Sequence, residues 1–479
     1  MSGFPAFSKT IAPMAFALWL ATSSNAISQT IDVDALRSAA EAGSAQAQLQ
    51  LGEVLLYGNA GMSADADTAL SLLDQAAEAG FVPAKARLGK VLLDGFYTDP
   101  DPSRGIGLLK EAAAADNALA QATLGEALLW GHRTEADPAR AQNLLQAAAE
   151  AGNTNAMRLL GEQLVGGWIL ERNIPQGLAL LEKGVAANDA ASEVALGTML
   201  LYGDPLPRDR NRALALFEAA AEKGNGEGLH HYGRDLMWRE KDKDAAEAYL
   251  IRSAEMGVEA AWTTLSEGAM YGYLGLSQRR KFEGYAERAL EEGETHIAVL
   301  EAQRRLYGIN MRASGPKAIE GLEQAAEAGN DEAAKYLIAL VRDGNRYNVR
   351  KSPDQAAAYL EKFSELLNAN EKDRLAFTIE AAKARGAARF SELAKDFESR
   401  PELKSSDFGK EIYAANPNLA IFLLQSRLKE QGIFAGKPDG LAGKATLSAL
   451  WKACLALPSN KQCYDTVMHP NVIGRLLAL

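Results

Sequence analysis

The chain has 479 residues, of which 47% are hydrophobic and 24% charged, and a chain of this length normally divides into more than one compact core. Aromatic residues make up only 7% of the sequence, which favours closely packed helices over a β-sandwich. The net charge of -11 repels a phosphate backbone, so the composition excludes nucleic acid as the expected partner.

The N-terminus has the parts of a secretory signal peptide, which we expect to span residues 1–26. Lys9 supplies a positive charge, residues 11–21 form an apolar run, and Ser24 and Ala26 are small residues at the positions that signal peptidase reads. The run is shorter than the roughly 20 apolar residues that span a bilayer. We therefore expect cleavage after Ala26 and export to the periplasm; an uncleaved anchor or a short buried helix is the alternative. No later segment predicts a transmembrane helix in the mature chain.

Residues 35–386 carry a repeated unit of about 36 residues. The segment at residues 39–58, AAEAGSAQAQLQLGEVLLYG, returns at residues 76–95 as AAEAGFVPAKARLGKVLLDG. The residue that ends the A-E-A-G element serves as the anchor of each unit, and a degenerate tenth unit is expected at residues 352–386. An anchor directly after a helix adopts a left-handed conformation, which Gly allows without strain and Asn or Asp tolerates. The anchors are Gly43, Gly80, Asp116, Gly152, Asn188, Gly224, Gly257, Gly293 and Gly329.

Three further positions recur at fixed distances from the anchor. Nine residues on stands a small residue such as Gly161, and because Gly inside a helix costs about 1 kcal/mol relative to Ala, we expect close helix contact there. Fifteen residues on, a second Gly predicts the end of that helix. The next helix carries an apolar ladder: Leu73, Leu109, Leu145, Leu181, Phe217, Leu250 and Leu322. The pattern predicts an all-α fold, a superhelical solenoid of about ten 36-residue helical hairpins with a long groove.

An aromatic residue stands fourteen residues past the anchor in six units: Tyr57, Trp130, Tyr202, Trp238, Tyr271 and Tyr307. Aromatic side chains presented at the repeat period could stack on sugar rings or hold the side chains of a partner protein. Because the position recurs with the repeat itself, packing between neighbouring hairpins is the preferred interpretation. Exposure of these side chains in the groove would instead favour a glycan ligand.

The helix patterns A-x-x-L-L-x-x-A-A-x-x-G and L-G-x-x-L-x-x-G, together with the period, resemble the Sel-like repeat family, which is related to tetratricopeptide repeats. The resemblance covers about residues 35–386. It implies an adaptor that gathers protein partners and has no catalytic activity of its own. Exported bacterial members serve exopolysaccharide secretion, envelope polarity or the control of sensor kinases, so the resemblance implies envelope proteins as partners in the repeat groove.

The repeat pattern fades after residue 386. Residues 387–416 are richer in charge and are expected to form a terminal helix and a linker, and residues 417–479 a small three-helix domain. In this last part, residues 423–453 resemble the peptidoglycan-binding-like domain. Their sequence is LLQSRLKEQGIFAGKPDGLAGKATLSALWKA. Every fixed position of that pattern is met, namely Leu424, Gln425, Leu428, Gly432, Gly436, Asp439, Gly440, Gly443, Thr446, Ala449 and Leu450.

The C-terminal resemblance implies a module that contacts peptidoglycan, although in many relatives it could serve only as a protein-binding knob. Asp439 and Gly440 are a turn signal, and Thr446 is expected to cap or brace the second helix, so most fixed positions should shape the fold. The module is expected to fold apart from the array and to tether it in the envelope. The candidate ligand contacts are Phe434, Lys437 and Lys444.

The two cysteines, Cys454 and Cys463, both stand near the C-terminus. An exported chain meets an oxidising compartment, so the pair predicts one local disulfide; two buried free thiols are the alternative. Only His469 stands near them, which is too few ligands for a zinc site.

The sequence contains no motif of a catalytic site. It lacks the zinc-peptidase motif H-E-x-x-H, the nucleophile elbow G-x-S-x-G and the phosphate-binding loop G-x-x-x-x-G-K-[ST]. No pair of carboxylates stands out as the acid and base of a glycan hydrolase. His230 and His231 are interpreted as solvated or core-edge residues of a repeat helix. We therefore expect no enzymatic activity, cofactor or metal. Two classes of function remain: a periplasmic scaffold that docks envelope proteins, with inhibition of a sensor kinase as a variant, and a protein that binds peptidoglycan or exopolysaccharide directly.

Overall fold

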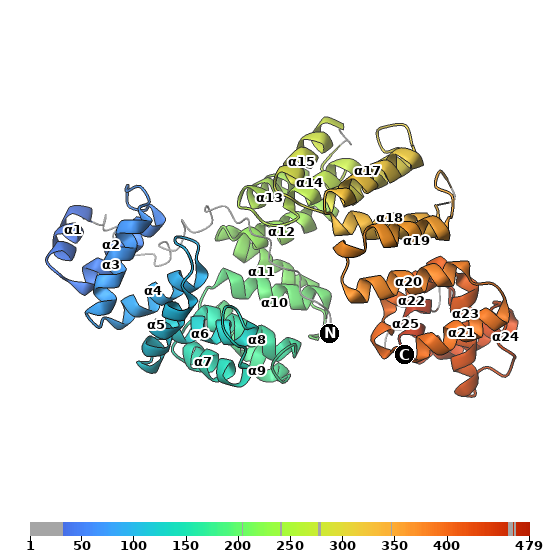
Figure 1. The fold of residues 1–479 in the computed structure, drawn as a ribbon, viewed down its shortest axis with the longest axis horizontal. Coiled ribbons are helices and arrows are strands. Elements are labelled where there is room, and N and C mark those ends of the chain that lie inside the picture. Colours follow the sequence, from blue (N-terminus) through green and yellow to red (C-terminus); the bar gives the residue numbers. More distant parts are fainter. Residues whose placement is uncertain are drawn as a thin grey trace. The chain divides into compact units, whose positions relative to one another are not determined.

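The computed structural model describes residues 32–203, 205–239, 242–275, 279–345, 347–457, 463 and 466–479. All regular elements in these residues are helices, α1 to α25 and the short 3-10 helices η1 and η2, so the all-α prediction is confirmed (Figure 1). The predicted signal peptide lies outside the described residues. The chain divides into two compact units, an N-terminal unit of the described residues up to 264 and a C-terminal unit from 265 onward.

The N-terminal unit is a stack of helical hairpins. Each even-numbered helix from α2 to α12 packs against the odd-numbered helix that follows it, and successive even-numbered helices also contact one another (Figure 1). The even-numbered helices therefore line one side of the stack, which we call the even-helix face. The helices are α1 (Val33–Glu41), α2 (Ala45–Tyr57), α3 (Ala66–Glu78), α4 (Val82–Asp94), α5 (Pro102–Ala114), α6 (Ala118–Trp130), α7 (Pro138–Glu150), α8 (Thr154–Gly166), α9 (Ile174–Ala186), α10 (Ala190–Tyr202), α11 (Arg210–Glu222), α12 (Gly226–Trp238), α13 (Lys243–Glu255) and the first residues of α14 (Ala261–Tyr271).

In the C-terminal unit the hairpins continue and end in a cluster of shorter helices. α16 packs against α17 and α18 against α19, as in the hairpins of the first unit. The helices are α15 (Arg279–Glu291), α16 (Ile297–Tyr307), α17 (Gly315–Glu327), α18 (Asp331–Asp343), α19 (Pro353–Lys362), η1 (Ser364–Leu366), α20 (Ala369–Lys383), α21 (Gly386–Glu398), η2 (Pro401–Leu403), α22 (Ser406–Ala415), α23 (Pro417–Glu430), α24 (Lys444–Leu455) and α25 (Pro470–Leu477).

Local residues set the boundaries of the hairpins. Asp101, for example, accepts a hydrogen bond of 3.0 Å from the backbone amide of Arg104, and Pro102 begins α5 with a residue that has no amide to satisfy. The anchors that end the odd-numbered helices adopt the left-handed conformation. Asp116 (φ 56°) and Asn188 (φ 63°) do so as well, as the pattern predicts.

A glycine inside the even-numbered helix lets the two helices of a hairpin approach closely. A Cβ atom at Gly161 would lie 2.8 Å from Cγ of Leu181 and 3.0 Å from the carbonyl oxygen of Gly177, both on α9. The structure thus confirms that the small residue marks the helix contact. The residues of the apolar ladder are all fully buried: Leu73, Leu109, Leu145, Leu181, Phe217, Leu250 and Leu322.

Residues 387–416 do not form a linker. They form α21, η2 and α22, and Phe397 and Phe408 lie in one hydrophobic core with Leu424 and Ile473 of the last helices. The expectation of a linker, and of a module that folds apart from the array, is therefore wrong. The charged residues that suggested a linker cover the outer side of amphipathic helices, whose Phe and Leu residues face the core at spacings of three and four.

A disulfide joins Cys454 of α24 to Cys463, with the two Cα atoms 6.0 Å apart. Both cysteines are buried and belong to the same core as α20 to α23. The three helices predicted for residues 417–479 are present as α23, α24 and α25, but they complete a larger core that begins in α20.

Candidate functional site

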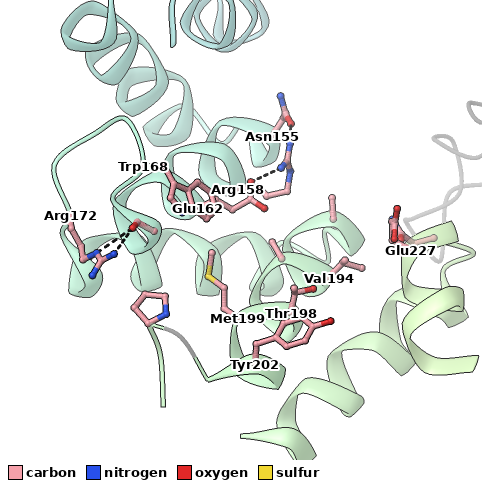
Figure 2. A pocket seen from close by; sticks show the side chains of 15 residues that line it. Asn155, Arg158, Glu162, Trp168, Arg172, Val194, Thr198, Met199, Tyr202 and Glu227 are labelled. Carbon is pink, nitrogen blue, oxygen red and sulfur yellow. Dashed lines mark hydrogen bonds and ion pairs between the residues drawn. The ribbon is translucent and has the colours of Figure 1, made fainter. Parts of the chain in front are cut away.

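A cavity of about 570 Å³ opens on the even-helix face of the N-terminal unit, between α8, α10 and the start of α12 (Figure 2). α8 presents Asn155, Arg158 and Glu162 to the cavity at spacings of three and four, so one stripe of this helix lines the wall. The opposite stripe, with Leu160 and Leu164, is buried in the core of the stack. The same helix therefore holds the repeat together and displays the cavity side chains.

The other walls come from α10 and α12. α10 contributes Thr198, Met199 and Tyr202, and Glu227 stands at the start of α12 (Figure 2). Loss of solvent raises the pKa of Glu227, and the neighbouring carboxylate of Glu259 raises it further. A partner would find the carboxyl group of Glu227 at this end of the cavity and mostly apolar side chains along α10.

The other charged side chains of the cavity are held by partners within the chain. Arg158 donates to Glu162 Oε2 through Nη1 (2.7 Å) and to Asn155 Oδ1 through Nη2 (2.8 Å). Burial raises the pKa of Glu162, and the Arg158 guanidinium opposes this shift. Arg172 donates to the carbonyl oxygen of Gly166 from Nε (3.2 Å) and Nη2 (2.7 Å), which fixes the loop after α8 (Figure 2). These groups need no reordering before a partner binds.

The predicted aromatic positions are exposed rather than packed in the core. Trp130, Tyr202 and Trp238 of the N-terminal unit are 40%, 64% and 44% exposed, and Tyr271 and Tyr307 of the C-terminal unit are 43% and 56% exposed. Packing between hairpins, the preferred interpretation of the pattern, is therefore wrong for these residues. Each one is the last residue of its even-numbered helix, past the leucines that fill the core, so its side chain projects beyond the hairpin contact.

Arginines of the next even-numbered helix contact two of the tyrosines. Tyr57 is partly exposed; its ring meets that of Tyr97 edge-on with centroids 5.8 Å apart, and Arg87 Nη1 donates to its hydroxyl at 3.4 Å. Tyr202 has the equivalent contact, a 3.4 Å hydrogen bond from Arg234 Nη2. Neighbouring repeats therefore fix the direction of these rings.

In the N-terminal unit, two exposed aromatic residues were not predicted from the sequence, Phe96 (74% exposed) and Trp168 (61% exposed). They belong to the two repeats of the N-terminal unit that end their even-numbered helix in Asp94 or Gly166 instead of an aromatic. The indole ring of Trp168 lies over Gly166. A Cβ atom at that glycine would be only 2.5 Å from Cε2 of the indole. Its ring therefore occupies the space that an aromatic side chain at position 166 would take.

Six successive even-numbered helices thus have one exposed or partly exposed aromatic residue each, either as their last residue or two residues past it. A signal for the missed pair was present in the sequence, because in both repeats the aromatic residue comes two positions late, directly after the glycine that ends the helix. We call this set the aromatic row, which consists of Tyr57, Phe96, Trp130, Trp168, Tyr202 and Trp238.

One of the three candidate contacts in the C-terminal helices is wrong. Phe434 is only 6% exposed and lies in the shared core, with its ring folded against Gly436. The loop between Gly432 and Gly436 folds back on α23, which the turn residues alone did not reveal. Lys437 and Lys444 are exposed, and their role as ligand contacts stays a prediction.

The fixed positions of the C-terminal pattern hold the fold together. Gln425 is buried, and its Nε2 donates to Asp439 Oδ1 (2.9 Å), Leu441 O (3.0 Å) and Thr446 Oγ1 (2.9 Å). Its Oε1 accepts from the backbone amides of Asp439 (2.9 Å) and Gly440 (2.8 Å). One side chain therefore satisfies the turn and the start of α24, and none of these groups points to a bound ligand.

The two adjacent histidines lie at the edge of the core. His230 Nε2 is 3.0 Å from Thr264 Oγ1, and the His231 ring stacks on Phe217 with centroids 4.5 Å apart. Burial, and secondly the charge of Arg234, lowers the pKa of His230 to about 3 and that of His231 to about 4, so both are neutral at pH 7. In the part of the chain that the structure describes, no three His, Cys, Asp or Glu side chains are grouped to hold a metal ion. Nor is any helix among these residues long and apolar enough to cross a bilayer.

The family model of the Sel1 repeat matches the chain eight times, and the matches together cover more than half of it. The first five matches each begin at the first residue of an even-numbered helix. No curated protein matches the chain. The matched residues are 45–81, 82–117, 118–153, 154–189, 190–225, 228–258, 302–330 and 333–366.

Two of the solved structures that resemble the chain are repeat proteins. One is c5321, a protective antigen present in uropathogenic Escherichia coli strains that displays an SLR fold; it is 20% identical over 94% of each chain, with a TM-score of 0.46. The other is a Sel1 repeat protein from Oxalobacter formigenes, 23% identical over 64% of this chain and 89% of that one, with a TM-score of 0.41.

Proposed function

Because the chain belongs to the Sel1 repeat family, whose members generally act as non-enzymatic scaffolds for protein–protein interaction, we propose that it binds proteins along its even-helix face. The observation that carries the proposal is the aromatic row, whose Trp168 and Tyr202 line the cavity. Trp, Tyr and Arg supply most of the binding energy at protein interfaces, since they bury large areas for little loss of side-chain freedom.

The cavity supports the same proposal, because it is formed before any partner arrives. Arg158 is held by Glu162 and Asn155, and Arg172 by the end of α8. A partner side chain would dock against Met199 and the two rings without ordering these groups, which lowers the entropic cost of binding. The cavity is therefore suited to one anchoring side chain of a protein whose other contacts spread along the row.

We further propose that the scaffold works in the periplasm. The signal-peptide pattern of residues 1–26 and the disulfide between Cys454 and Cys463 both suit an oxidising compartment reached by export. Its partners would then be envelope proteins, in exopolysaccharide secretion, in envelope organisation or in the inhibition of a sensor kinase. The C-terminal helices would act as a tether, which raises the concentration of the even-helix face near those partners.

A second candidate is direct binding of peptidoglycan or an exported polysaccharide. The exposure of the aromatic row favours it, because aromatic faces also stack on sugar rings. The internal pairing of Arg158 with Glu162 agrees with a ligand of low charge. The C-terminal resemblance to a peptidoglycan-binding-like domain adds to this candidate, although its fixed residues serve the fold.

Site-specific photo-crosslinking in the exported full-length chain tests the scaffold. A benzophenone amino acid replaces Tyr202 or Trp168, and in the control it replaces Lys110, an exposed residue on the odd-numbered helix α5. We expect a discrete crosslinked protein from positions 202 and 168 and none from position 110. No protein product from 202 and 168, or the same product from 110, would rule out binding on the even-helix face. Competition of the crosslink by purified peptidoglycan or exopolysaccharide would favour the second candidate.

A further inference from the structure

The last helices are basic although the chain is acidic. Residues 417–479 contain seven Lys and Arg against three Asp and Glu, whereas the whole chain contains 51 against 62. Lys437, Lys444 and Lys452 of this segment are exposed. Charge complementarity therefore points to an anionic partner for this end of the molecule, and the acidic repeats would repel the same partner.

α24 turns one face to the core and the other to solvent. The exposed face carries three large apolar side chains at a spacing of four, Leu447 (37% exposed), Trp451 (36%) and Leu455 (36%). Lys444 and Lys452 flank them on the same side of the helix, because the steps of 100° per residue place all five within less than half a turn. The buried residues of the opposite face are Thr446, Ala449, Leu450, Ala453 and Cys454.

The loop before α24 carries another exposed apolar side chain. Leu441 is 58% exposed, and its carbonyl oxygen accepts hydrogen bonds from Gln425 Nε2 (3.0 Å) and Thr446 Oγ1 (3.0 Å). These bonds hold the loop against the first turn of α24. Large apolar side chains that are exposed on one helix face and flanked by lysines are typical of an interaction surface.

We propose that the exposed face of α24, together with Leu441, docks on the surface of a bilayer that contains anionic phospholipid. The inference rests on the proposed envelope tether and names its ligand. The ammonium groups of Lys444 and Lys452 pair with headgroup phosphates, and the apolar side chains enter the boundary between headgroups and acyl chains, as in an interfacial amphipathic helix. Tryptophan is enriched at that depth of the membrane.

The composition of the face favours lipid over glycan. Sugar rings stack on aromatic faces, but the large exposed apolar residues of this helix face are one aromatic, Trp451, and two leucines, Leu447 and Leu455. Aliphatic side chains gain from contact with acyl chains and gain little from the hydroxyl-rich surface of a polysaccharide. The two lysines add attraction to phosphate that falls with ionic strength.

Vesicle co-sedimentation of the mature full-length chain tests the proposal; the full chain is needed because α23 to α25 share their core with α20 to α22. Vesicles of phosphatidylglycerol mixed equally with phosphatidylcholine are compared with pure phosphatidylcholine. We expect binding to the mixed vesicles alone, released by salt. The surface pair K444Q/K452Q should weaken it on the order of thirtyfold, and L447Q/W451Q should abolish it. The matched control, Y347Q/K110Q, removes an exposed aromatic and an exposed lysine outside residues 417–479 and should bind as wild type.

The outcomes separate the alternatives. Circular dichroism shows whether L447Q/W451Q folds, and if it does not, K444Q/K452Q carries the test, because both lysines are exposed. Absence of binding to the mixed vesicles, or equal binding by K444Q/K452Q, overturns the proposal. Sedimentation with purified peptidoglycan that the same variants abolish, without vesicle binding, would assign the face to the wall instead. None of these results changes the crosslinking expected at Tyr202 and Trp168, so a failed tether is distinguishable from a failed scaffold.

Discussion

Single glycines determine how closely the helices of a hairpin pack. Gly161 and Gly107 are both helical, but Gly161 faces Leu181 across the hairpin, whereas nothing lies within 4 Å of a Cβ atom at Gly107. Gly161→Ala should lower the free energy of unfolding by about 1–3 kcal/mol through overpacking, and Gly107→Ala should raise it by up to about 1 kcal/mol through helix propensity. Urea denaturation measures both changes. A stability loss in Gly107→Ala, or none in Gly161→Ala, would show that the small residue has another role.

The adjacent histidines His230 and His231 give a residue-scale prediction about pH. Both pKa values are lowered from the ordinary 6.5, to about 3 for His230 and about 4 for His231, so above pH 6.5 the folded and unfolded chains both hold neutral imidazoles. Below it, the unfolded chain takes up protons that the folded chain does not, and the free energy of unfolding falls by up to about 1.4 kcal/mol per pH unit for each histidine. His231→Phe keeps the stack on Phe217 and removes one of these groups. Its unfolding free energy, measured by urea denaturation, should therefore fall less steeply than that of wild type from pH 6.5 to about pH 4.5; parallel curves would contradict a neutral His231.

At the scale of elements, the hairpins could be predicted because their signals are local. The caps, the left-handed anchors and the buried ladder each depend on residues within one repeat, so the period locates them. Periodicity does not say how far a side chain at a helix end extends past the core, and the aromatic positions were therefore assigned to the wrong environment. Trp168 escaped detection because its chain position is shifted by two, although its ring lies over Gly166. Only long-range packing shows that Phe397 and Phe408 share a core with α25.

Across the whole molecule, function follows from repetition along the chain. Each repeat of the N-terminal unit adds one aromatic residue to the even-helix face, so a partner that spans several repeats would add contacts to the one that its anchoring side chain makes in the cavity. The acidic repeats and the basic last helices suit different partners, a protein for the first and an anionic surface for the second. Neither role needs a catalytic residue.

The most direct test of the aromatic row moves one of its members back to the helix end. Trp168→Asn removes the ring and introduces the residue that follows the helix-ending glycine in the first repeat, where Asn59 stands. The double variant G166W/W168N restores an aromatic at the position it holds in α6 and α10, and the space is available because Trp168 itself supplies the nearest atoms to a Cβ at 166.

The measurement is the yield of protein crosslinked from position 202 in each background. We predict a clear loss in Trp168→Asn and recovery in the double variant; an unchanged yield in the single variant, or no recovery in a double variant that folds as wild type, would contradict the aromatic row as the binding surface.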